Sequence, residues 1–524
     1  MLSVVLFAAC SRGPEFPDRP QGFGTLRGTI IDANSAPVPA RVYAVGSDDS
    51  TYFAVNCIPY ERPGFWKTVG YSGKHFTTRG NTFTVHLPKG RAAITVERGK
   101  EYIPTSDTLE IAVGKTVERT FILRRWADMA SKGWYSGDTH VHRPLCDMAD
   151  LMLAEDLNVA VPQTVWNQKR DDDLDAWLGK ADPSGTVRVD STRVFSVLSH
   201  EIERFNIGAV LFHHTGKTVM PVVGCTDWSP TDLSLMEKTH VAGGYCEIEK
   251  PWWPESHIDL AVGKGDLVGI ANNHFTYKSY LPEHPRKREE FHPDYPQGVR
   301  GYALYVFDLW YAYLNCGFRM APTAGSASGV LPNPLGYNRV YVKLDGLFSY
   351  EAWIKGLVAG QSFVTNGPLL LATVNGKDPG ETAEIDSLTE KSVEVDCLVC
   401  SLVPIERVEV LRNGSVIYTA NDPKLKNNRT IVQTLVPVTE TCWIAVRCFE
   451  KREDTLRFAH TAPVWISVGG KPFIPKRAAA EYFLKKTREV IAAAPGQKFQ
   501  DKESRNAAME VYRKAEAVYA GILK

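Results

Sequence analysis

Apolar and polar residues alternate in short runs over residues 24–125. The stretch GTLRGTIIDANSAPVPARVYAVG turns at Asn-Ser-Ala-Pro, and the stretch NTFTVHLPKGRAAITVERG turns at Pro-Lys-Gly. Alternation with a period of two, bounded by such turn residues, is typical of half-buried strands. Because no helical period interrupts these strands, we expect residues 24–125 to form a small β-sandwich.

The pattern changes over residues 126–335, where short continuous apolar runs alternate with helical ones. Four runs end in polar or small residues: LNVAVPQT, RVFSVLSHE, DLVGIANNH and RMAPTAGSA. The stretches MADLMLAEDL and GYALYVFDLWYAYLNCG between them are expected to be helices. Continuous apolar runs are typical of buried parallel strands, whose carboxyl ends form binding sites. We therefore predict an α/β barrel over residues 126–335.

Strand-like runs return over residues 336–470 and predict a C-terminal β domain, into which one helix, SYEAWIKGLVAGQ, is inserted. Over residues 471–524, apolar positions recur three and four apart in two blocks separated by a Pro-Gly break. This spacing predicts a helical tail folded as a hairpin. A chain of 524 residues is too long for one hydrophobic core. The expected fold class is multidomain α/β plus β.

Charge and cysteine content narrow the choice of partners. The 60 basic and 60 acidic residues balance, and no long basic run occurs, so nucleic-acid binding has no electrostatic support. The ten cysteines lack the paired spacing of a structural zinc site. In an exported chain, Cys397 or Cys400 could form a disulfide with Cys442 or Cys448 of neighbouring strands.

Residues 1–23 differ from the rest of the chain. MLSVVLFAAC is an apolar run that ends in small residues and a cysteine, and a Pro-rich polar linker follows it. The run is too short to span a bilayer. It resembles a bacterial lipoprotein signal with Cys10 as the lipidated residue, although no Lys or Arg precedes it. We expect an exported protein, in the periplasm or at the cell surface, with a lipid anchor at Cys10 as its only membrane contact.

A group of potential metal ligands begins in GWYSGDTHVHRP, where Asp138, His140 and His142 occupy alternate positions. On an extended strand these three side chains share one face, so two imidazoles can reach one cation. Glu201, in SVLSHEIER, and His274, in GIANNHF, each follow a short apolar strand. We expect His140, His142, His274 and Glu201 to hold one divalent ion (zinc, manganese or iron).

The order of these motifs resembles a known family. A D-x-H-x-H strand, a strand ending in Glu, a Gly-Gly turn and a strand ending in His follow the order of the PHP superfamily of metallohydrolases. The stretches LNCGFRMAPTAGSASG and YNRVYVKLDGLFSYEAWIKGLVAGQSFVTNGPLLL are similar to its CehA/McbA-like branch. The resemblance covers residues 126–375. It implies a distorted (β/α)7 barrel with a metal centre at the strand ends, and hydrolysis of phosphate esters or other esters. Residues 24–125 resemble a carboxypeptidase regulatory-like β-sandwich.

Two motifs of that family are degenerate here. Its Thr-Asp-His element falls where this chain has Gln163, Thr164, Val165 and Trp166, its terminal Asp-x-His falls at Ala327, Ser328 and Gly329, and its His-Pro element is Lys250-Pro251. A centre with several cations needs anionic or imidazole ligands to offset the repulsion between them. We therefore expect one ion rather than two or three, with Glu201 or Asp138 as the catalytic base.

Three functions are compatible with this pattern. The first is an exported metal-dependent hydrolase that acts on an ester or phosphoester of a small molecule or glycan. The alternative is a degenerate, non-catalytic barrel that serves as a surface carbohydrate- or ligand-binding protein, in which the aromatic pair Trp252 and Trp253 stacks on sugars. The third is a structural lipoprotein without a ligand. The residues do not determine the oligomeric state.

Overall fold

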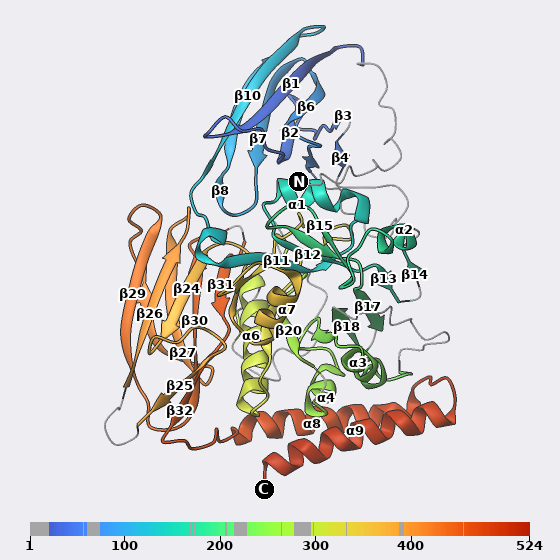
Figure 1. Cartoon of the computed structure of the whole chain (residues 1–524), viewed down its shortest axis with the longest axis vertical. Coiled ribbons are helices and arrows are strands. Elements are labelled where there is room, and N and C mark those ends of the chain that lie inside the picture. Colours follow the sequence, from blue (N-terminus) through green and yellow to red (C-terminus); the bar gives the residue numbers. More distant parts are fainter. Residues whose placement is uncertain are drawn as a thin grey trace.

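A computed structural model describes residues 20–55, 57–59, 74–167, 169–171, 173–204, 207–213, 228–263, 265–276, 295–296, 298–331, 333–386, 392–453 and 455–524. The chain is multidomain, is built largely of β-sheets, and ends in a helical tail (Figure 1). The expected lipoprotein signal with Cys10 lies outside the described residues. Among the described helices, none is long and apolar enough to cross a membrane.

The N-terminal strands form two five-stranded sheets that share one core. Leu26 and Val85 from one sheet and Val42 and Ile94 from the other are fully buried in it, as period-two alternation requires. One sheet contains β1 (Phe23–Asp32), β3 (Ala54–Val55), β6 (Thr82–Pro88), β8 (Tyr102–Ile103) and β10 (Thr116–Arg125). The other contains β2 (Arg41–Val45), β4 (Ile58–Pro59), β5 (Phe76–Thr77), β7 (Gly90–Glu97) and β9 (Thr105–Ile111).

The middle of the chain contributes strands to two sheets. The first set is β11 (Trp134–Val141), β12 (Val159–Pro162), β15 (Thr186–Arg188) and β16 (Val194–Ser196). The second is β13 (Val165–Trp166), β14 (Lys169–Arg170), β17 (His200–Arg204), β18 (Gly208–His213), β19 (Tyr245–Ile248), β20 (Leu267–Ala271) and β21 (Ala321–Ala324). A main-chain hydrogen bond joins the two sets. The amide of His142, just after β11, donates to the carbonyl of Ser328, just after β21, at 2.8 Å.

Parallel and antiparallel pairs are mixed in this region. β12 pairs parallel with β11 and β16, and β20 pairs parallel with β19 and β21, as the apolar runs predict. β18, in contrast, pairs antiparallel with both β17 and β19. Three residues separate β17 from β18, whereas a parallel crossover needs about a dozen.

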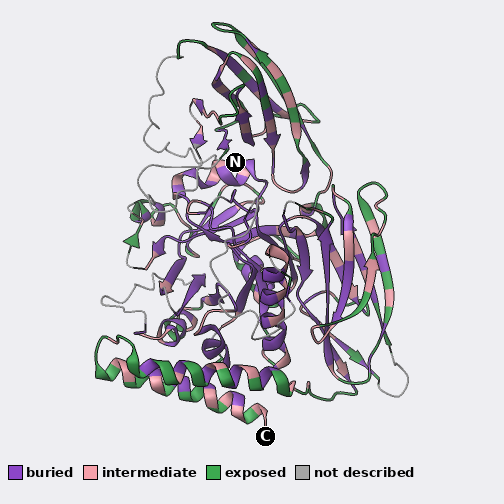
Figure 2. Ribbon diagram, turned by 180° about the vertical axis from the view of Figure 1, so that it is seen from behind, coloured by how far each residue is buried: buried purple, intermediate pink, exposed green. Residues whose placement is uncertain are grey.

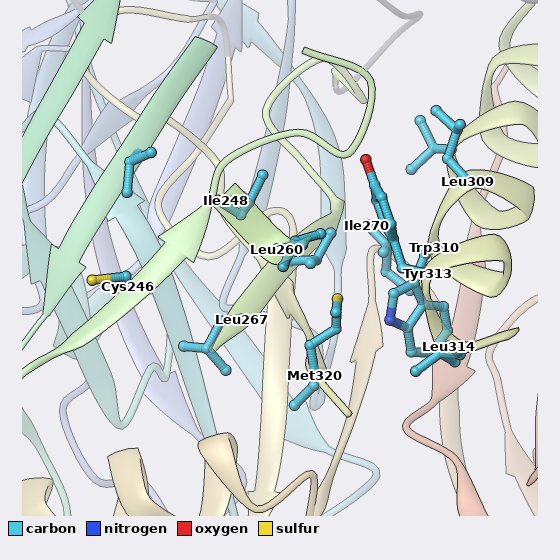
Figure 3. Close-up of a cluster of buried hydrophobic side chains, with 14 of the residues drawn as sticks. Cys246, Ile248, Leu260, Leu267, Ile270, Leu309, Trp310, Tyr313, Leu314 and Met320 are labelled. Carbon is cyan, nitrogen blue, oxygen red and sulfur yellow. The ribbon is translucent and has the colours of Figure 1, made fainter. Parts of the chain in front are cut away.

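The described helices of this region lie between or after the strands. They are η1 (Ala130–Lys132), η2 (Leu145–Asp147), α1 (Met148–Ala154), α2 (Leu174–Leu178), α3 (Asp232–Val241), α4 (Ser256–Ala261) and α6 (Val299–Asn315). Figure 3 shows the core that α6 covers: Leu309, Trp310, Tyr313 and Leu314 of the helix lie near Ile270 of β20 and the surrounding apolar side chains. The helix is buried nearly all round, which explains its almost continuous apolar sequence.

The sheet that contains β11, β12, β15 and β16 continues into the strands after residue 335. β22 (Arg339–Lys343) pairs antiparallel with β11 and leads into the C-terminal strands. These are β23 (Ser362–Thr365), β25 (Thr382–Ile385), β27 (Ile405–Arg412), β28 (Ser415–Asn421), β30 (Cys442–Glu450), β31 (Phe458–Thr461) and β32 (Val464–Val468). A separate three-stranded sheet contains β24 (Leu369–Val374), β26 (Ser392–Cys400) and β29 (Arg429–Pro437), and α7 (Tyr350–Val358) is the inserted helix.

The disulfides that are possible among the C-terminal strands of an exported chain are not formed in this structure. Cys397, Cys400, Cys442 and Cys448 are all free thiols that lie buried in one apolar core. Burial raises the pKa of Cys397 and of Cys442, the latter to about 11, which keeps these thiols protonated and unreactive.

The tail forms a helical hairpin of α8 (Arg477–Ala493), η3 (Ala494–Gly496) and α9 (Lys502–Ile522). Figure 2 shows that both long helices expose one side and bury the other. Tyr512 and Tyr519 are buried, and their hydroxyls donate to Glu255 at 3.0 Å and to the His257 carbonyl at 2.5 Å. The hairpin is therefore docked on the segment that contains α4.

Buried ion pairs join the sandwich to the middle region. Arg41, which is 6% exposed, pairs with Glu155 after α1 and with Glu97 at 2.5 Å. Arg125 pairs with Asp156 at 2.6 Å. We expect Arg41→Met to lower the free energy of unfolding by about 3–5 kcal/mol, because it leaves the Glu155 carboxylate buried without its partner.

Denaturant unfolding of the full chain measures this effect. Arg91→Met is the matched control, because Arg91 and Glu110 are about three-quarters exposed and 3.9 Å apart. Its effect should stay below about 1 kcal/mol. Equal effects of the two substitutions would contradict a role for Arg41 in joining these parts.

Candidate metal centre

Three side chains from two sheets converge on one point. His140 and His142, at the end of β11, turn their Nε2 atoms toward each other at 2.9 Å. Glu201 of β17 places Oε2 3.3 Å from the His140 nitrogen and 3.0 Å from the His142 nitrogen. All three residues are at least 95% buried. The expectation that His140, His142 and Glu201 lie together is met by this geometry.

The donor triangle fits a metal ion. Its sides of 2.9, 3.0 and 3.3 Å are close to the roughly 3.0–3.4 Å between neighbouring ligands that bind a cation at about 2.1 Å. No other protein donor of the described chain approaches Glu201 Oε2 as a hydrogen-bond partner. Two imidazoles and one carboxylate are also the ligand set that zinc, manganese and iron accept. The residues present therefore fit one divalent ion.

The charges of the site favour a cation. Burial by itself lowers the pKa of His140, but Glu201 and Glu249 outweigh it and raise that pKa to about 9. Burial likewise raises the pKa of Glu201, yet the two histidines hold it well below its usual range. Without a metal, a proton shared with His140 compensates the buried carboxylate. A divalent ion would take the place of that proton.

Glu249 supports His140 from the other side of its ring. Its Oε1 lies 3.6 Å from His140 Nδ1, so the ring stands between two carboxylates, one at each nitrogen. A carboxylate behind a histidine ligand orients the ring and fixes its tautomer. Glu249 itself is held by an ion pair with Lys250 and by a bond from Trp253 Nε1 at 3.3 Å.

Lys250, at the position where the resemblance to the PHP superfamily places a histidine, therefore points inward. It is 3% exposed and lies near the rings of Trp252 and Trp253. Its positive charge lowers the pKa of His140, so it is electrostatically within reach of the donor triangle. A cation at this point opposes a second metal ion.

The positions of the degenerate motifs surround the same centre. Trp166 lies with its ring 4.7 Å from that of His142, and Ala327 donates its amide to the His140 carbonyl at 2.7 Å. The Thr164 hydroxyl donates to backbone carbonyls of Val197 and Ser199. These groups provide packing and main-chain bonds around the histidines but no charged ligand.

The carboxylate of Asp138 is held by hydrogen bonds from three residues. Its carboxylate accepts from the His140 amide, from the amide and the hydroxyl of Ser326, and from the Gly336 amide at 2.7 Å. These four donors occupy all four acceptor sites of a carboxylate. The pairing of β11 with β12 has a register irregularity between Asp138 and Val141. Asp138 thus links β11 to Ser326 and Gly336; burial raises the pKa of its carboxyl to about 6, and its role as a base stays a prediction.

His274 lies outside the donor triangle. The groups of metal-ligand atoms in the described chain unite His140 and His142 with Glu201 but do not include His274. Its ring packs 5.8 Å from Trp252 and 6.1 Å from Tyr302. Its role as a ligand stays a prediction that this arrangement does not support.

Two other histidines have different surroundings. His200 faces away from Glu201 on β17, and burial lowers its pKa to about 4, so its imidazole is neutral. His240, at the end of α3, forms a hydrogen bond with Asp266 at 2.8 Å.

An acidic group of Asp232, Glu255 and Asp259 lies around Arg204, which forms ion pairs with the first two. Neither place matches the donor triangle.

Two carboxylates near the histidines, Glu249 and Glu203, are not among the site residues that the sequence predicts, although Glu203 stands at the same strand end as Glu201. Glu249 directly follows β19, so the rule that strand ends carry the site would have found it. Glu203 lies two positions after Glu201 and thus on the same face of β17. Burial, together with Glu201 and Glu249, raises the pKa of Glu203 to about 7.

Comparisons with known proteins leave the family open. No family model matches the chain, and no curated protein matches it significantly. Among solved structures, a similarity is found to GBS52, the minor pilin of the Gram-positive pathogen Streptococcus agalactiae. It has 14% identity and a TM-score of 0.15 over 20% of this chain and 45% of the pilin chain. A similarity at this level carries no argument about fold or function.

Proposed function

We propose that the protein is an exported hydrolase of PHP type that uses one divalent metal ion to cleave an ester or phosphoester. The observation that carries the proposal is the buried triangle of His140, His142 and Glu201, whose sides suit neighbouring ligands of one ion. In this proposal β11, β12, β16, β17 and β19–β21 are strands of a distorted seven-stranded barrel, and the metal centre lies at their ends.

The chemistry is divided between the ion and the chain. A bound divalent ion supplies Lewis-acid chemistry. His140, held by Glu249, and His142, packed on Trp166, fix the ligand geometry. Glu203 takes the place of Asp138 as the base that accepts a proton from water, because its carboxyl lies beside Glu201 and is not part of the donor triangle.

Chelation followed by metal addition tests this function. The full chain is treated with a chelator, then assayed on a panel of ester and phosphoester substrates with zinc, manganese or iron(II) restored. We expect turnover to fall to background and to return with about one equivalent of one of these ions. Turnover that survives complete removal of metal would contradict the proposal, as would a chain that binds metal but cleaves no substrate of the panel.

One observation favours the alternative of a carbohydrate-binding protein. Trp252 and Trp253 line a cavity of about 330 Å³ between the middle region and α8, whose other aromatic walls are Trp228, Tyr305, Tyr313, Tyr482 and Phe483. Flat aromatic walls suit the apolar faces of sugar rings. Retained glycan binding by chelated protein, without turnover in any metal form, would support this alternative.

Export with a lipid anchor is a separate part of the proposal. In a Gram-negative host grown with labelled palmitate, the full chain should incorporate label, and Cys10→Ser should not, because it removes the thiol that carries the lipid. Cys57→Ser is the matched control and should leave labelling unchanged. Equal labelling of wild type and Cys10→Ser, or none in either, would contradict the lipoprotein prediction.

A further inference from the structure

A cavity of about 280 Å³ lies where the sandwich, the middle region and the C-terminal strands meet. Figure 1 shows β8, at the foot of the sandwich, close to this junction. Its charged lining consists of five basic residues, Arg41, Lys100, Arg339, Arg452 and Arg457, and three acidic ones, Glu97, Glu155 and Glu450. Five minus three leaves an excess of two positive charges. Moreover, two of the three acidic residues form ion pairs with the same basic residue, Arg41.

The three carboxylates of the cavity form ion pairs with only some of its five basic residues. Glu97 and Glu155 both pair with Arg41. Glu450 accepts from the Ser401 hydroxyl at 2.9 Å and lies 4.0 Å from Arg452. Among the described residues, no carboxylate forms an ion pair with Lys100 or Arg339. Two cations thus face the cavity without a counter-charge in contact.

Arg339 is the more deeply buried of the two, with 1% exposure. Its Nε donates to the Gly336 carbonyl at 2.7 Å, and its Nη2 donates to the Glu155 carbonyl at 3.2 Å. Its Nη1 has no hydrogen-bond partner within the described part of the chain. A buried guanidinium donor without an acceptor is costly, and an oxyanion is the acceptor that a guanidinium fits best.

Lys100 is held against a second cation. Its Nζ donates to the Asn366 carbonyl at 2.9 Å, and Arg457 Nη1 donates to the same oxygen at 3.0 Å. Both cations also lie over the Tyr337 ring, at 5.1 and 5.2 Å from its centre. Lys100 itself forms no ion pair with a carboxylate of the described residues, so its charge is balanced only by this carbonyl and ring. Burial lowers the pKa of Lys100 well below its usual range, and Arg457 and Arg339 lower it further.

We propose that this junction cavity is a binding site for a small oxyanion, a phosphate or sulfate group, held by Lys100, Arg339 and Arg457. The group accepts from Arg339 Nη1 and compensates the excess positive charge. Because Lys100 comes from the sandwich, and Arg339 and Arg457 come from residues 336–470, the bound anion stabilises the junction between these two parts. The site is separate from the metal centre and does not depend on its function.

Inorganic phosphate and sulfate are the probes. Titration calorimetry and thermal unfolding of the full chain are carried out at constant ionic strength, with sodium chloride as the reference salt. We expect saturable binding and a rise in Tm that chloride does not produce. A phosphate ion fills only part of the cavity, so a hexose phosphate is the second arm. Tighter binding of the hexose phosphate would mean that the sugar contacts the aromatic wall of Trp126 and Tyr337. Equal binding of the two would mean that the site recognises the phosphate group alone.

Lys100→Met tests the assignment with two readouts of opposite sign. It should weaken phosphate binding at least about tenfold, since it removes one charged donor. Without phosphate its Tm should equal or exceed that of wild type, because the ammonium has no carboxylate partner to lose. Lys89→Met, an equal change at an exposed position of the same sandwich, should leave binding within about twofold.

Arg452→Gln provides a second variant at the partly exposed rim of the cavity and should weaken binding severalfold without disturbing the core. The proposal is overturned if wild type shows no saturable binding of phosphate, sulfate or hexose phosphate. It is equally overturned if Lys100→Met and Lys89→Met bind the anion alike.

Discussion

Replacing His142 by alanine should reduce the metal bound after chelation and reloading from about one equivalent per chain to nearly zero. His142 contributes one of only three donor atoms in the triangle with His140 and Glu201. Loss of one leaves two ligands, which do not hold a divalent ion against water. His140→Ala should have the same effect. Metal content by mass spectrometry, together with Tm to show that the fold persists, measures the result.

Three further variants sharpen this experiment. Glu201→Gln keeps the side-chain volume and should lower affinity at least about tenfold, since it replaces a charged ligand by a neutral one. His86→Ala, in the sandwich, is the matched control and should retain full metal. His274→Ala should also retain it, because that ring lies against Trp252 and Tyr302.

The stoichiometry decides between the readings of this centre. Two or three tightly bound equivalents would contradict a single-ion site and would mean that other residues replace the degenerate motifs. No metal in folded wild-type protein would contradict the metal centre altogether and favour the binding-protein alternative. Loss of metal in His274→Ala would restore the ligand set that the sequence alone predicts.

Replacing Glu203 by glutamine should lower kcat by about 10²–10³-fold while the metal content stays at that of wild type. The carboxyl lies beside Glu201 on the same face of β17 but outside the donor triangle, so its loss removes a proton acceptor without removing a ligand. Steady-state kinetics on the best substrate of the panel, with metal measured on the same sample, separate these two effects.

Glu384→Gln, at an exposed position of β25, is the control for the loss of one carboxylate and should leave kcat unchanged. A kcat of Glu203→Gln within about threefold of wild type would contradict the role of Glu203. In that case Glu201 and Asp138, the two bases that the sequence predicts, would be the next variants to assay.

Local sequence was sufficient for much of the secondary structure. The amphipathic stretch SYEAWIKGLVAGQ forms α7, and the nearly continuous apolar stretch after Gly301 lies in α6. The period-two segments of residues 24–125 are strands in the described residues. These features depend on the spacing of apolar residues within one element, so a single sequence carries them.

The residues of the site could be predicted only in part from the sequence pattern. His140 and His142 are two positions apart, and Glu201 marks a strand end, so pattern alone pointed to them. Asp138 has the same spacing, yet its carboxylate accepts hydrogen bonds from Ser326 and Gly336, almost 200 positions later, which the pattern could not predict.

The sequence by itself determined the strands and helices, the two histidines on one strand and the absence of charged ligands at the degenerate motifs. The tertiary structure decided which carboxylates lie at the imidazole rings: Glu201 and Glu249 do, whereas Asp138 accepts from backbone amides, that of His140 included. It also decided that β18 runs antiparallel to its neighbours and that Lys100 and Arg339 meet in one cavity. The reason is physical: periodicity reports on neighbours along one element, whereas hydrogen bonds and charges between distant segments depend on how the elements pack.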